Sequence, residues 1–177
     1  MASLIENLIG ILDKENNEYN QLLNLSLDKT SVIVKGDIEK LQVIVAQEQK
    51  KIEVINKLEK SREENIKDIA NVLNIPENEF KLDSLIKMLE KQPREQEELS
   101  KVRDAFKRTM NKLVKVNDNN RVLLQESINM IEFELNLSRN TMLAPETANY
   151  SKEAYNTMGK NLVAGSFDAK QWWGGDK

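Results

Sequence analysis

SVIVKGDIEKL, residues 31–41, is the stretch in which one helical pattern stops and another begins. Apolar residues recur every three or four positions on both sides of it, which is the spacing of amphipathic helices. Gly36 can adopt the left-handed conformation that closes a helix. Asp37 can then cap the next helix by accepting hydrogen bonds from its free N–H groups. A link this short forces two antiparallel neighbours, so the sequence predicts a helical hairpin.

The helices of this hairpin can be followed outward from the link. The first is expected to start at a capping box formed by Ser3 and Glu6. The second is predicted from Ile38 to Leu73, where Asn74-Ile75-Pro76 ends it because the residue before proline avoids the α region. At about 1.5 Å per residue, the second helix is roughly 55 Å long.

A short connector helix and a third long helix come next. Asp83 or Ser84 is expected to open the connector, and Pro93 either closes it or starts the next element. The third helix is predicted from Arg94 to Arg139 and carries a near-heptad apolar seam. The fold class is therefore all-α: an elongated, antiparallel, coiled-coil-like three-helix bundle over residues 1–140. Residues 141–177 contain four of the six glycines and five of the nine aromatic residues, and are predicted to form a flexible tail that is a candidate for partner binding.

Composition excludes several classes of function. The chain contains no cysteine and no histidine, so it lacks thiolate ligands, the commonest zinc ligand and the commonest general base. A net charge of −3 does not suit a phosphate-binding surface, so nucleic acid is not an expected partner. We expect no enzymatic activity, no metal site and no cofactor. The first ten residues do not resemble a signal peptide, and no apolar run reaches the roughly 20 residues that span a bilayer, so the expected location is the cytoplasm, without stable membrane insertion.

Polar residues interrupt the apolar seams at Glu48, Arg62, Asn117 and Asn120. They can fix the register of the bundle, as buried polar residues do in coiled coils. Alternatively, they can line an open groove that a partner chain fills. Both interpretations remain open from the sequence.

A second apolar stripe, Met130, Phe133 and Leu137, appears near the end of the third helix. It can pack on the first helix, since each helix of a three-helix array meets two others, or it can form the floor of a groove for an amphipathic partner helix. The third helix is longer than the other two, so its end is expected to overhang the bundle. Trp172 and Trp173 of the tail can seal the bundle or capture a partner.

Three motifs follow one another in order over roughly residues 1–140. Gly36 and Asp37 are followed by Leu41, and Leu58 and Arg62 form a Leu-x-x-x-Arg pattern. The third helix carries an Asn-x-x-Asn-x-x-x-Leu stretch in Asn117, Asn120 and Leu124. This ordered set resembles the FlgN family of flagellar type III secretion chaperones. Tyr155, followed by a glycine four residues later, resembles a feature of the family's tail, whereas the double tryptophan does not.

The resemblance implies an export chaperone that binds unfolded terminal segments of hook–filament junction proteins in the cytoplasm and delivers them to the membrane export gate. It points to Tyr155 for docking at the gate. We expect the client to bind along a groove between long helices, on the residues Leu124, Ile128, Met130, Ile131, Phe133, Leu135 and Leu137. The main alternative is a structural coiled-coil protein that forms a homodimer through the same seams and has no client. A membrane anchor in the tail is disfavoured because the tail lacks a basic face.

Overall fold

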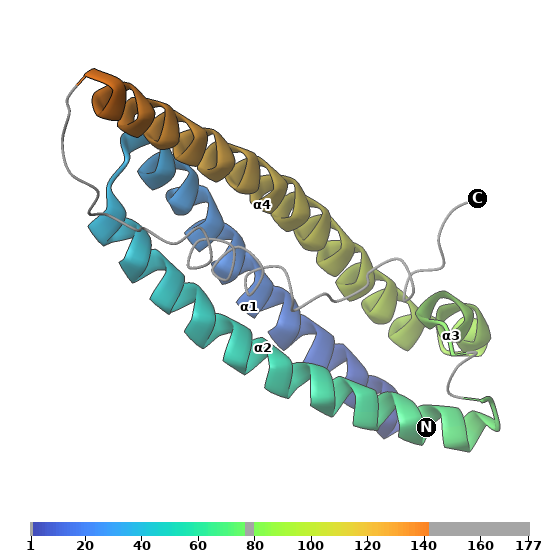
Figure 1. Cartoon of the computed structure of the whole chain (residues 1–177). Helices are drawn as coiled ribbons and strands as arrows, with labels where there is room; N and C mark the ends of the chain where they lie inside the picture. Colours follow the sequence, from blue (N-terminus) through green and yellow to red (C-terminus); the bar gives the residue numbers. More distant parts are fainter. Residues whose placement is uncertain (1, 77–79, 142–177) are drawn as a thin grey trace.

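The structure is a computed structural model that describes residues 2–76 and 80–141 (Figure 1). These ranges form helices α1 (Ala2–Lys35), α2 (Ile38–Leu73), α3 (Leu82–Met88) and α4 (Pro93–Thr141), with a 3-10 turn, η2 (Leu89–Lys91), between α3 and α4. No strand occurs in them. The predicted all-α class is confirmed, and the predicted bounds of the second and third helices are matched to within two residues.

The link between α1 and α2 has the predicted conformation. Gly36 has a φ of +66°, a left-handed value that side chains disfavour. The carboxylate of Asp37 accepts a hydrogen bond of 3.1 Å from the backbone N–H of Lys40. Asn74 closes α2 in the same left-handed region, with a φ of 58°. Both ends of α2 are therefore fixed by local chemistry.

Helix α1 lies between α2 and α4 (Figure 1). Helix α2 runs antiparallel to it, whereas α4 runs parallel: Thr109 of α4 bonds to Asn16, and Asn120, further along, bonds to Ser26. The extensive contacts of α2 and α4 are with α1, and the two outer helices have at most a few close contacts with each other. Helix α1 is therefore the central helix of the bundle, with α2 and α4 on either side of it.

The core is thickest around the N-terminal half of α1. Side chains of all four helices and η2 form one buried cluster, in which Tyr19 packs edge-on against Phe106 with ring centroids 5.3 Å apart. The cluster includes Ile5, Leu8, Leu12, Ile66, Ile69, Leu82, Leu85, Leu99 and Phe106. Helix α3 thus closes this end of the bundle by burying its apolar side on the long helices.

Two predicted helix starts are wrong. Helix α1 begins at Ala2, so Ser3 lies inside its first turn and cannot act as the cap of a Ser3–Glu6 box. Helix α3 begins at Leu82, after an extended Lys81 that makes no side-chain cap. Asp83 is instead paired with Arg103 of α4. Leu82 is buried, and α3 begins there, one residue before Asp83 and two before Ser84.

The proposed tail, apart from Thr141, lies outside the described residues, and with it Tyr155, Trp172 and Trp173. Within residues 2–76 and 80–141, no helix combines the length and apolar character needed to cross a membrane.

Candidate partner-binding surface

Helix α4 projects beyond the end of the bundle, as the sequence predicted (Figure 1). Hydrogen-bonded pairs on α1 and α4 lie 89 to 94 residues apart in sequence, so the end of α1 at Lys35 is level with about residues 124–129 of α4. Among the α4 residues up to Arg139, whose burial the structure describes, Asn120 is the last buried one, and every side chain from Asn129 to Arg139 is exposed. We call residues 129–141 the overhang; its 13 residues extend about 20 Å.

The apolar seam that faces α1 continues onto the overhang. Phe106, Met110 and Leu113 are buried against α1, and the same helical face then carries Leu124, Ile128, Ile131 and Leu135. Leu124 and Ile128 are half-buried, whereas Ile131 and Leu135 are exposed. We call these last four residues the seam stripe. Leu124 and Ile128, its inner half, pack on α1. Ile131 and Leu135, its outer half, continue the same helix-packing surface beyond the end of α1.

The second stripe, Met130, Phe133 and Leu137, lies on nearly the opposite side of α4. The interpretation that it packs on the first helix is wrong, because α1 ends before it and faces the other stripe. The five apolar side chains Met130, Ile131, Phe133, Leu135 and Leu137 are between 49% and 67% exposed. Such an accumulation on one short segment is typical of an interaction site.

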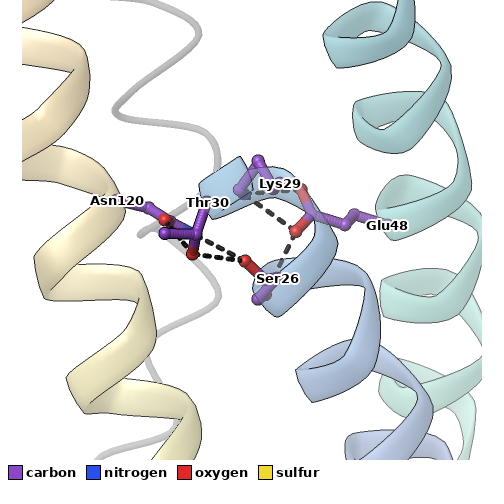
Figure 2. Close-up of polar contacts among 5 residues, drawn as sticks. All are labelled: Ser26, Lys29, Thr30, Glu48 and Asn120. Atoms are coloured by element: carbon purple, nitrogen blue, oxygen red, sulfur yellow. Dashed lines mark hydrogen bonds and ion pairs between the residues drawn. The ribbon is translucent and has the colours of Figure 1, made fainter. Parts of the chain in front are cut away.

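A buried polar layer anchors α4 at the base of the overhang (Figure 2). Lys29 of α1 donates to both carboxylate oxygens of Glu48 on α2, at 2.8 and 2.7 Å, and the Ser26 hydroxyl donates to Glu48 at 3.1 Å. On the other flank, the Asn120 amide donates to the Ser26 carbonyl at 2.7 Å and its oxygen accepts from Thr30 at 2.6 Å. One turn of α1 therefore ties together all three long helices.

The burial of the polar residues that interrupt the apolar seams decides whether these residues fix the register of the bundle or line an open groove. Glu48, Arg62 and Asn120 are each at most 2% exposed and are bonded to α1. They do not line an open groove; a shift of either outer helix along α1 would leave them buried and without these bonds. Asn117 is half-buried.

A comparison with protein-family models matches residues 1–157 to the FlgN protein family. The match covers most of the chain and extends from α1 past the end of α4. The chain belongs to the FlgN family. No curated protein and no solved structure matches it.

FlgN proteins are flagellar export chaperones, so this chain binds substrates of flagellar export. The family is one of chaperones rather than of enzymes. Binding of a protein segment requires exposed apolar surface on a rigid support. The overhang carries exposed apolar side chains of this kind, and the polar layer holds the helix from which it extends.

Sequence reasoning did not identify Lys29, although it anchors the layer of this FlgN-family protein. The signal was present: Lys29 stands three residues after Ser26 and four before Ile33, on the buried face of α1. A lysine in an apolar stripe requires a buried acid on the facing helix, and Glu48 interrupts the α2 seam.

Replacement of Asn120 by alanine is expected to loosen the base of the overhang. It removes the bonds to Thr30 and Ser26, whose hydroxyl and carbonyl keep only the 3.2 Å bond between them, and the loss of these two hydrogen bonds costs about 1–3 kcal/mol. Urea unfolding followed by circular dichroism measures this loss. Asn119→Ala, at the exposed neighbouring position, is the control and should change stability by less than about 0.5 kcal/mol. Equal effects of the two variants would contradict the anchoring role.

A second buried contact, between a carboxyl and a guanidinium group, lies deeper in the bundle. Arg62 of α2 donates to Glu15 of α1 at 2.5 Å, and the hydroxyl of Tyr19 donates to Glu59 at 3.0 Å. Burial of the carboxyl raises the pKa of Glu15 to about 7, against the opposing effect of the Arg62 charge. The native state therefore holds a proton that the unfolded chain releases between pH 4.5 and 7.

Stability is consequently expected to fall as pH rises through this window, by about 3 kcal/mol for the full shift of the Glu15 pKa. The chain has no histidine that would titrate in the same range. Denaturant unfolding at pH 5 and pH 7.5 measures the difference, and Glu15→Gln should flatten it. Glu18→Gln, which alters the more accessible Lys51 pair, should retain the slope. A wild-type protein that is more stable at pH 7.5 would contradict the assignment.

Proposed function

We propose that this FlgN-family protein binds the C-terminal segments of hook–filament junction proteins in the cytoplasm and delivers them to the flagellar export gate. The observation that supports this proposal is the overhang, where two apolar stripes are exposed on one helix. The client is an amphipathic segment that stays unfolded until assembly and covers these stripes on the chaperone.

The binding residues in this proposal are those of the seam stripe and the second stripe. Ile131 and Leu135 extend the seam that already holds one helix, so they suit another helix with the same spacing. Met130, Phe133 and Leu137 offer a second side, and methionine adapts to varied partners. A client that contacts both sides would cover more apolar area than a single seam allows.

Release at the gate belongs to the same proposal. A segment that becomes ordered only on binding loses conformational entropy, which lowers its affinity for a given contact area. Tyr155, which the family resemblance assigns to gate docking, lies within the matched range of residues 1–157. Because Tyr155 is close in sequence to the overhang, docking at the gate is expected to affect the client bound on the overhang.

Calorimetric titration of the chain with C-terminal segments of hook–filament junction proteins tests the proposal. Saturable 1:1 binding is expected, and a version ending at Thr141 should keep it if the overhang carries the site. Loss of binding in that version would move the site to residues 142–177. Absence of heat with every segment, together with a stable dimer in analytical ultracentrifugation, would favour the self-associating coiled coil.

A further inference from the structure

A pocket lies between the last turns of α1 and the middle of α4. Its volume is about 520 Å³ and its walls are mainly apolar. It is lined by Leu27, Thr30, Ser31, Val34, Lys35, Lys115, Val116 and Asn119. One lining residue, Thr30, is also part of the polar layer, where it is bonded to Asn120.

The side of α4 that lines the pocket continues along the helix to the second stripe. Val116, Leu123, Met130 and Leu137 succeed one another at seven-residue steps and so share one side of α4. Val116 and Leu123 are half-buried beside α1, and Met130 and Leu137 are exposed on the overhang. We call this series the lateral track. With Lys112 at its start it spans 26 residues, or about 38 Å, which is the length of a helix of seven turns.

Charge is distributed unevenly along the lateral track. Lys35, Lys112 and Lys115 are exposed at the pocket end, and among the described residues no ion pair joins any of them to an acid. Towards the tip of α4, the exposed charges beside the track are those of Glu126 and Glu134. The track is therefore positive at the pocket and negative on the overhang.

We propose that the lateral track binds an amphipathic helix whose carboxylates lie at the pocket end, against Lys35, Lys112 and Lys115. This proposal rests on the proposed client binding and adds to it the direction and charge of the bound segment. Charge complementarity selects the occupant: residues 142–177 carry four acidic and four basic residues, so they lack the required excess of carboxylates. A second copy placed with its α4 antiparallel would bring Glu126 and Glu134 towards the pocket as well, so self-association is one of the outcomes that the test distinguishes.

We expect the lysines to determine which client segment binds and in which direction, rather than to supply most of the binding free energy. Single exposed ion pairs contribute little, but three cations around one pocket raise the association rate and make binding depend on salt. The apolar residues of the track would hold the client, and the lysines would decide which end of it enters the pocket.

The test is a charge reversal in the full chain, Lys112→Glu with Lys115→Glu. Lys57→Glu with Lys60→Glu on the exposed side of α2 is the matched control, with the same spacing and the same change in net charge. Affinity for an acidic client segment is measured at 50 and 300 mM salt. The α4 variant should bind at least tenfold more weakly at 50 mM salt and lose the salt dependence, whereas the α2 variant should stay within twofold of wild type.

Two designed 26-residue amphipathic helices with identical apolar positions serve as further probes. One carries glutamates at one end and the other carries lysines there. Wild type should prefer the glutamate helix, and K112E/K115E should reverse the preference. Equal affinity for both helices, or preference for the lysine helix by wild type, would overturn the proposal.

The two proposals fail in distinguishable ways. If K112E/K115E binds client segments like wild type while substitutions on the overhang abolish binding, the charge selection is wrong and the chaperone site stands. If no client segment binds but the glutamate helix does, the lateral track stands and the client assignment is wrong. Concentration-dependent dimerisation that K112E/K115E abolishes would assign the track to a second copy and overturn the proposal.

Discussion

Ile131→Asp combined with Leu135→Asp is expected to weaken client binding by at least 100-fold and to leave the bundle folded. Both side chains are exposed and lie beyond the end of α1, so their replacement removes no contact of the core. Burial of each against a client would contribute about 1.5–3 kcal/mol. Calorimetric titration with the junction-protein segments measures the loss, and circular dichroism with thermal unfolding checks that the fold persists.

Two further variants separate loss of the site from loss of the helix. Ile131→Gln with Leu135→Gln keeps strong helix formers and should lose binding to a similar degree. Val43→Asp with Val114→Asp places the same two charges at exposed valines outside the stripes and should bind like wild type. Undiminished binding by a helical I131D/L135D protein would exclude the seam stripe as the client site.

Lys29→Met is expected to be the most destabilising single substitution in the polar layer. The Lys29 and Glu48 side chains are 5% and 2% exposed, and the change leaves Glu48 with the Ser26 hydroxyl as its remaining bond. Removal of one partner of a buried pair costs about 3–5 kcal/mol, because the other charge stays buried. Urea unfolding at constant pH measures the change in free energy of unfolding.

The double variant Lys29→Met, Glu48→Leu should recover most of this loss, since well-packed apolar residues replace buried pairs at little cost. Lys51→Met, which breaks the more accessible pair with Glu18, should cost at most about 1 kcal/mol. A Lys29→Met protein no less stable than Lys51→Met would mean that the layer contributes little.

Local chemistry explains why much of the fold was predictable. Gly36 and Asp37 each perform a function that depends only on their neighbours, so the hairpin link could be predicted from two residues. The same holds for Pro76 and Pro93, near which α2 ends and α4 starts. The starts of α1 and α3 were predicted wrongly, because Ser3 and Asp83 resemble caps locally, and Asp83 is used by Arg103 instead.

The arrangement of helices and the candidate site depended on information that periodicity does not carry. The spacing of Met130, Phe133 and Leu137 is the same whether they face α1 or solvent. The hydrogen bond between Asn120 and Ser26 shows how α4 is aligned with α1, and this alignment places the end of α1 before these three residues. The pocket beside Lys35 and Lys115 joins residues some 80 positions apart in sequence, and no pattern within either helix indicates it.

The overhang has a further consequence for the exchange of backbone amide hydrogens. It lies beyond the end of α1, and a helix of 13 residues is marginal in water by itself. We expect its amides to exchange by local fraying, while those of α1, which is packed on both flanks, exchange only on global unfolding. A client that covers the stripes would slow exchange from residue 129 onward and leave α1 unchanged, so the occupancy of the chaperone could be measured at one end of a single helix.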